Sequence, residues 1–160
     1  MGGEVADVPE ERIAAAVDRL SASGVAVDVS VEGPATRYEA TRPGYRVQVL
    51  VHPSRFIGLE FDLVDPDGSV RLHYFADTGR YDVSQPRHAW YLSATATDVV
   101  LFLEALADGG LLAKVERRRA ELIVPTGAGP LIVARGRVWT SAGRYRGDRE
   151  TAIRKGFQPV

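Results

Sequence analysis

Residues 45–74 read YRVQVLVHPSRFIGLEFDLVDPDGSVRLHY, and apolar and polar side chains alternate along most of this stretch. The alternation predicts half-buried strands over Tyr45–Val51 and Ile57–Leu63. The DPDG segment at residues 65–68 has the composition of a type I turn, and Val70–Tyr74 follows it as a further strand. Because the connections are this short, the strands are expected to form an antiparallel meander.

The same period of two extends toward the N-terminus, where it predicts strands over Val25–Val31 and Ala35–Thr41. We expect the first of these strands to be half-buried, with its valines on one face. Before it, apolar residues at helical spacing predict a helix over Asp7–Ser23. Asp7, with Glu10 three residues later, resembles a capping box at the start of that helix.

Toward the C-terminus, an apolar segment predicts a second helix over residues 98–110, with Thr97 or Asp98 as its cap and Gly-Gly at residues 109–110 as its end. This is the most hydrophobic element, so we expect it to lie across the concave face of the sheet. The expected fold class is α+β. It is a single domain over residues 1–160, a twisted antiparallel sheet of five to seven strands with an N-terminal helix and a central apolar helix packed on it.

The last third of the chain is less regular. Residues 121–124 and 131–139 flank the segment PTGAGP and predict a hairpin. Residues 114–121 fit either a charged helix or an edge strand. Residues 141–160 are a polar, Arg-rich tail that fits either a short helix near residues 148–155 or a mobile end.

The composition excludes several functions. The chain has 160 residues, a formal net charge of −1 and no cysteine, which excludes disulfides, thiolate catalysis and cysteine-based zinc sites. Residues 1–80 hold 8 basic and 13 acidic side chains and residues 81–160 hold 12 and 8, an asymmetry that suits contact with another charged macromolecule. The N-terminus lacks the features of a signal peptide, and no apolar run approaches the roughly 20 residues that cross a membrane. We therefore expect a cytoplasmic protein without membrane contact.

The segment from Leu72 to Leu103, LHYFADTGRYDVSQPRHAWYLSATATDVVLFL, gathers aromatic residues around a charged loop. Trp, Tyr and Arg most often carry the energy of protein interfaces, so we predict a partner-binding surface over residues 77–91, with Arg117–Arg119 as a further contact. The candidate contact residues are Asp77, Arg80, Tyr81, Asp82, Arg87, His88 and Tyr91.

Two aromatic residues of this segment are expected to behave differently. Trp90, next to the expected helix, is predicted to pack on it, so Trp90→Ala would cost about 3 kcal/mol or more if the ring is buried. Tyr81, in the loop, is predicted to contact the partner. Tyr81→Ala would then lower affinity and leave the melting temperature nearly unchanged.

A catalytic interpretation uses the same loop. Asp82 and His88 could form an acid–base pair that activates water, provided that they are hydrogen-bonded. Neither Thr78 nor Ser84 stands in a nucleophile motif, and residues 77–79 also fit a simple hairpin turn. The three histidines have no metal-ligand spacing, and the Gly-rich residues 126–129 lack the lysine of a phosphate-binding loop, so we expect no metal and no cofactor.

Arg117–Arg119 is the densest charge run, and Trp139 and Tyr145 follow it in the sequence. Further arginines stand in the same part of the chain, at Arg135, Arg137, Arg144, Arg146 and Arg149. Such residues could neutralise and stack on a nucleic acid. Glu116 and Glu121 offset the run and the whole chain is slightly acidic, so a solvated edge is favoured and no nucleic acid partner is expected.

Residues 75–106, FADTGRYDVSQPRHAWYLSATATDVVLFLEAL, resemble actinobacterial immunity proteins of polymorphic toxin systems. In size and helix-first layout the chain is similar to the immunity-factor family of the mycobacterial necrotizing toxin, a secreted NAD glycohydrolase. The resemblance implies a cytosolic antitoxin that blocks the active site of the toxin sterically, with no catalysis of its own. The order of elements also resembles the secretion-chaperone-like fold, which implies a protein that protects a client segment.

Overall fold

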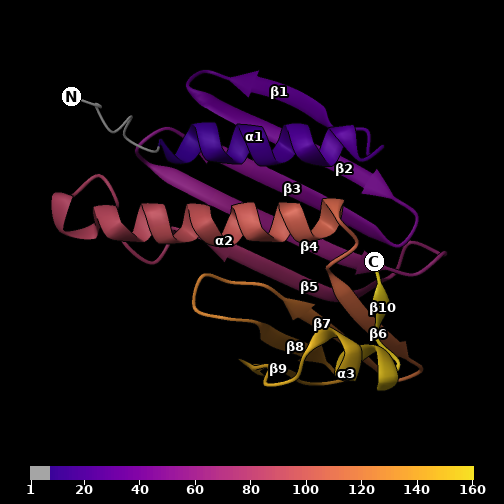
Figure 1. Ribbon diagram of the computed structural model, residues 1–160. Helices are drawn as coiled ribbons and strands as arrows, with labels where there is room; N and C mark the ends of the chain where they lie inside the picture. The colour runs from indigo at the N-terminus through magenta and orange to yellow at the C-terminus, as the bar shows by residue number, and fades with distance from the viewer. Residues whose placement is uncertain (1–7) are drawn as a thin grey trace.

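The computed structural model describes residues 8–160, which form two five-stranded antiparallel sheets and three α-helices (Figure 1). Two long helices, α1 (Pro9–Ala22) and α2 (Ala89–Ala107), lie side by side in front of the N-terminal sheet (Figure 1). The C-terminal sheet lies beside them with the short helix α3 (Arg149–Arg154) in front of it. The expected α+β class, with two helices packed on a sheet, is confirmed.

The N-terminal sheet is a meander in which each strand pairs antiparallel with the next along the chain. Its strands are β1 (Asp28–Glu32), β2 (Ala35–Arg42), β3 (Tyr45–His52), β4 (Phe56–Val64) and β5 (Val70–Asp77). In β3 and β4 the buried side chains alternate with more exposed ones, as the sequence predicts. The expected antiparallel meander is therefore confirmed.

The main core lies between this sheet and the two helices. Ile13 and Leu20 of α1 are buried there, as is Phe61 at the centre of β4. The ring of Phe102 on α2 lies 5.1 Å from the ring of Phe61 and 5.6 Å from the ring of Tyr74 on β5. These ring contacts join the central helix to the middle of the sheet.

Tyr74 makes the free energy of unfolding depend on pH in the alkaline range. Burial raises the pKa of the Tyr74 hydroxyl to about 12, and the Asp98 carboxylate adds to the increase. In the unfolded chain a tyrosine titrates at about pH 10, so the unfolded state loses its proton first as the pH rises. We therefore expect the contribution of Tyr74 to the free energy of unfolding to be constant below about pH 10 and to fall between about pH 10 and 12. Urea unfolding of the wild type and of Tyr74→Phe measures it, because the variant has no hydroxyl to titrate. An equal decline in both proteins would assign the effect to other groups.

The C-terminal sheet has the strand order β10-β6-β7-β8-β9, and all its pairs are antiparallel. Its strands are β6 (Leu112–Glu116), β7 (Arg119–Val124), β8 (Leu131–Arg135), β9 (Thr140–Arg144) and β10 (Gln158–Pro159). The second core cluster of buried residues joins α3 to this sheet and consists of Leu112, Ile123, Ala152 and Phe157. Asp148 caps α3 by accepting a hydrogen bond of 2.7 Å from the Thr151 backbone N–H.

The single sheet of five to seven strands that we expected is two sheets of five strands each. The ambiguous residues 114–121 belong to β6, its turn and β7, and the predicted hairpin around PTGAGP is β7 and β8. The polar tail is ordered, because it supplies most of β9, a helix close to the one predicted and β10. Ala120, Leu122 and Val124 of β7 are buried in the main core, so the two sheets share it.

Helix α2 begins earlier than predicted. A 3₁₀ turn over Pro86–His88 leads directly into it, so Thr97 and Asp98 lie inside the helix and do not cap it. The Thr97 hydroxyl donates to the Ser93 carbonyl oxygen at 3.1 Å, and Asp98 Oδ1 accepts from the Gly127 N–H at 2.8 Å. The polar groups of Thr97 and Asp98 therefore have partners within the fold, so these two residue types did not mark the start of the helix as predicted.

The N-terminal part of the sheet also departs from expectation. Val25 is buried, but every residue of β1 is exposed, with Val29 at 57% and Val31 at 69%. The prediction of a half-buried strand is therefore wrong for the part of the segment that forms β1. The physical reason is that β1 is the edge strand, beyond the part of the sheet that α1 covers (Figure 1). Asp7, the first residue of the predicted capping box, lies outside the described residues. Glu10, the second, accepts a hydrogen bond of 3.2 Å from the Ser54 N–H.

The helical segment Pro86–Ala107 is, among the described residues, the one helix long and apolar enough to cross a membrane by length and composition. No segment of this kind was expected from the sequence. In its most apolar window 33% of the residues are buried in the fold, and its buried positions from Thr95 to Leu106 pack in the main core. The core helix of a soluble protein can meet the same criterion, and core packing accounts for the apolar side chains at these buried positions.

Candidate protein-binding site

The loop that follows β5 is anchored to the sheet by Thr78, whose side chain is 1% exposed. The Thr78 backbone N–H donates to the Ile57 carbonyl oxygen at 2.9 Å, and the Thr78 hydroxyl accepts from the Ile57 N–H at 3.0 Å. The same hydroxyl also approaches the Ile57 carbonyl oxygen at 3.3 Å. Val83, which is also buried, holds the loop at a second point. The loop is therefore held against the fold at two points, Thr78 and Val83.

Thr78→Val should lower the free energy of unfolding by about 1–3 kcal/mol, because it leaves the buried Ile57 N–H without an acceptor while keeping the side-chain volume. Thr78→Ser keeps the hydroxyl and is the matched control. Urea denaturation of both variants makes the comparison. A loss in the serine variant as large as that in the valine variant would mean that the hydroxyl is not the anchor.

The middle of the loop is a hydrogen-bonded turn centred on Asp82. Asp82 Oδ1 accepts from the Ser84 hydroxyl at 2.5 Å and from the Ser84 N–H at 3.2 Å, and Oδ2 accepts from the Gln85 amide at 3.1 Å. The Ser84 hydroxyl, followed by the Gln85 amide, holds the pKa of the Asp82 carboxyl below its usual value, with a smaller contribution from His88. Both carboxylate oxygens thus serve the shape of the loop.

Four aromatic rings form a cluster at the start of α2, which we call the aromatic platform: Tyr81, His88, Trp90 and Tyr91. Tyr81 is at its centre, stacked on His88 at 4.8 Å and edge-to-face with Tyr91 at 5.0 Å. Trp90 contacts the Tyr91 ring at 5.4 Å, and the Tyr91 hydroxyl donates to the Asp77 carbonyl oxygen at 3.1 Å. These contacts tie the first turn of the helix to the end of β5.

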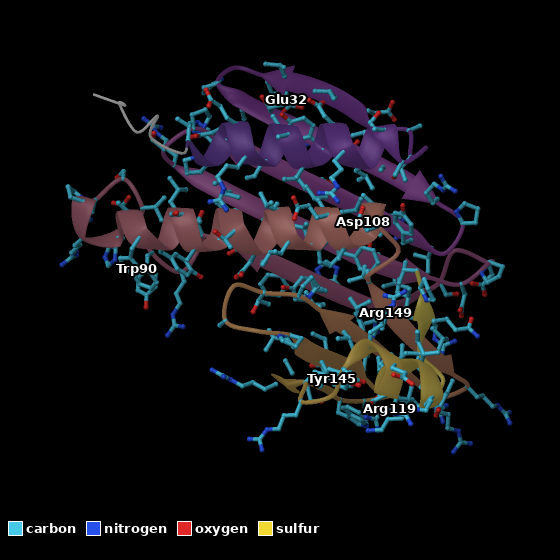
Figure 2. All side chains as sticks on the ribbon, viewed as in Figure 1. Glu32, Trp90, Asp108, Arg119, Tyr145 and Arg149 are labelled. Atoms are coloured by element: carbon cyan, nitrogen blue, oxygen red, sulfur yellow. The ribbon has the colours of Figure 1, made fainter. Side chains whose placement is uncertain are left out.

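Trp90 lies at the opposite end of α2 from Asp108 (Figure 2), and its side chain is 60% exposed. The expectation that Trp90 packs into the fold is therefore wrong, because the helix begins at Ala89 and its first six residues include no buried side chain. Single exposed apolar side chains are normal on protein surfaces, but Trp90 is joined to the rings of Tyr81 and Tyr91, and a contiguous exposed patch is what marks an interaction site. In the aromatic platform, Trp90 is the ring most open to a partner.

The structure brings the seven predicted site residues together in this one region. Asp77, Tyr81, His88 and Tyr91 are half-buried, while Arg80, Asp82 and Arg87 are exposed. Asp77 Oδ1 accepts from the Gly79 N–H at 2.9 Å, and the Arg80 guanidinium lies 5.5 Å from the Tyr81 ring centroid. Arg87 stands next to His88 in the 3₁₀ turn that leads into α2.

Two aromatic residues that come before the loop in the quoted segment do not join this cluster. Tyr74 and Phe75 are neighbours on β5, so their side chains point to opposite faces of the sheet. Tyr74 stacks on Phe102 in the core, and Phe75 lies 6.0 Å from the His73 ring with 60% of its surface exposed. Alternation along the predicted strand was the signal that could have separated them.

No hydrogen bond joins Asp82 to His88 in the part of the chain that the structure describes, and each has other partners. The pair that does form is Asp62 with His73, at 2.6 Å on the open face of the N-terminal sheet, where Arg46 also contacts Asp62 at 3.2 Å. Register across the predicted hairpin could have found it, because Asp62 pairs directly with His73. Within residues 8–160 no group of three or more acidic or histidine side chains could hold a metal ion.

Arg117–Arg119 does not extend this surface. Arg117 and Arg118 form the turn between β6 and β7, and Figure 2 shows Arg119 on the far side of the molecule from Trp90. Comparison of the chain with protein-family models, with curated proteins and with solved structures finds no match.

Proposed function

We propose that this protein is a non-enzymatic partner-binding protein, an immunity protein that binds a cognate toxin and blocks it. The observation that carries the proposal is the 60% exposure of Trp90 within a hydrogen-bonded, ring-packed cluster. An ordered aromatic surface loses little conformational entropy when a partner binds, so more of the contact energy becomes affinity. The exposed side chains of Arg80, Asp82 and Arg87 lie close to these rings in the chain and provide charges of the kind found in the polar rim of interfaces.

The class of toxin follows from the resemblance of residues 75–106, which points to a secreted NAD glycohydrolase. The protein would act in the cytoplasm, without cofactor, membrane or nucleic acid, by covering the active site of the toxin. Such inhibition requires only a rigid, complementary surface.

A direct test uses a purified NAD glycohydrolase toxin of this class, together with the products of the genes adjacent to that of the protein. NAD hydrolysis is measured with increasing amounts of the protein, and complex formation is followed by size-exclusion chromatography. We expect a one-to-one complex and loss of hydrolysis at equimolar protein. If no such toxin, and no product of a gene adjacent to that of the protein, forms a complex, the immunity function is wrong.

A further inference from the structure

A depression of about 420 Å³ lies between the start of β5 and the C-terminal sheet, separate from the aromatic platform. Six of its nine lining residues are arginines and none is acidic: Arg71, Arg117, Arg118, Arg119, Arg135 and Arg137. They come from the start of β5, the β6–β7 turn, the start of β7, the end of β8 and the β8–β9 turn. The fold therefore gathers guanidinium groups that are up to 66 positions apart in the sequence.

Most of this positive charge is not neutralised within the fold. Arg71 pairs with Asp65 at 3.1 Å and Arg119 with Glu121 at 2.6 Å. Arg135 donates only to the Val70 carbonyl oxygen, at 3.4 Å. Arg117 and Arg137 make no hydrogen bond or ion pair through their side chains to any residue of the described 8–160 range, and the same holds for Arg118. Four of the six guanidinium groups thus lack a carboxylate.

The turn that carries Arg117 and Arg118 is also unusual for a hairpin. Two-residue hairpin turns favour Gly or Asn, because the preferred turn types need positive φ. Among the described residues the one non-glycine with positive φ is Ser54, so both arginines have negative φ. Turn geometry therefore allows arginine at these two positions but does not require it, so the two positive charges are not a consequence of the turn type.

We propose that this depression binds a small molecule with two or three linked phosphate groups. Arginine is the side chain best suited to phosphate, because its planar fork donates two parallel hydrogen bonds to one group. A terminal phosphate of such a chain brings three acceptor oxygens and a phosphate inside it brings two, and the whole group carries about three to four negative charges at neutral pH, so linked phosphates match four guanidinium groups that have no carboxylate partner. The depression is also of a size usual for small-molecule sites, about 300–1,000 Å³. An acidic peptide brings one charge and two acceptor oxygens per side chain, so it supplies less negative charge to this volume than linked phosphates do.

Titration calorimetry with inorganic tripolyphosphate tests the proposal at low and at moderate salt. We expect saturable one-to-one binding that weakens as salt rises. Arg117→Ala/Arg118→Ala should weaken binding by about tenfold or more, because it removes two guanidinium groups that donate charge-assisted hydrogen bonds to the phosphates. Arg137→Ala should show a smaller loss in the same direction. The double variant changes two exposed turn residues, and a thermal melt checks that it is folded.

Arg55→Ala/Arg154→Ala is the matched control, since it removes the same charge from two exposed positions outside the depression. We expect it to bind tripolyphosphate within about twofold of the wild type, because only general electrostatic attraction changes. The proposal is overturned if binding does not saturate, or if the control loses as much as the depression variants. It is also overturned if polyglutamate competes as well as tripolyphosphate, or if only a single-stranded oligonucleotide binds. None of these results bears on the toxin complex, whose residues and assay are different.

Discussion

Trp90→Ala should weaken the complex with the partner by about thirtyfold or more, equivalent to roughly 2 kcal/mol, while the fold stays intact. The side chain is 60% exposed, so its removal opens no cavity in the core. The variant does lose the ring contacts of Trp90 with Tyr81 and Tyr91, and we expect this loss to cost about 1 kcal/mol of stability or less. Affinity is measured by calorimetry with the NAD glycohydrolase toxin, and stability by urea denaturation.

Phe75→Ala is the matched control for this prediction, because Phe75 is also 60% exposed but lies on the open face of the N-terminal sheet. We expect it to leave affinity unchanged within about twofold, as most exposed residues outside an interface centre do. Tyr81 is half-buried and contacts His88, Trp90 and Tyr91, so Tyr81→Ala should lower both affinity and stability, and the sequence-based expectation of an unchanged melting temperature is revised. Equal losses of affinity in the Trp90 and Phe75 variants would remove the aromatic platform as the contact site.

The half of the fold that was predictable from the sequence is the half built from local signals. In residues 45–74 the alternation of apolar side chains, the DPDG turn and the short connections all act over a few residues, and the meander they predict is the one observed. The helices were predicted for the same reason, because their buried faces repeat at helical spacing. Only their ends, which depend on neighbouring loops, were misplaced.

The second sheet could not be predicted in this way. All five residues of β9 are exposed, so its sequence TSAGR has no apolar alternation to reveal a strand. It is a strand because β8 offers hydrogen bonds along its full length, and that partner comes from tertiary structure. The same is true of β10, whose two residues pair with β6 from the far end of the chain.

The candidate site was found as a set of residues but not as an arrangement. The seven residues lie between Asp77 and Tyr91, so any fold would keep them near one another. Which ring is exposed depends on where α2 begins, and the helix starts at Ala89 because Pro86–His88 form a 3₁₀ turn before it. The arginine depression depends still more on tertiary structure, because its arginines come from both sheets.

Phe102→Ala should be the most destabilising of the substitutions considered, at about 3–5 kcal/mol. The side chain is 1% exposed, and its ring touches both Phe61 and Tyr74, so it joins α2 to two strands of the sheet. Removing it leaves a cavity that the helix cannot fill without breaking its other contacts, such as the hydrogen bond from Gly127 to Asp98.

Urea denaturation of Phe102→Ala and Phe102→Leu measures this effect, and the leucine variant is the control because it refills most of the volume. We expect the leucine variant to lose clearly less than the alanine variant, about 1–2 kcal/mol. Phe102 and Trp90 lie on the same helix, so the two alanine variants separate the functions of its two halves. The core half should determine stability and the exposed half should determine affinity. A loss below about 1 kcal/mol in Phe102→Ala would contradict the packing of α2 on this sheet, because no closely packed aromatic ring is removed at so small a cost.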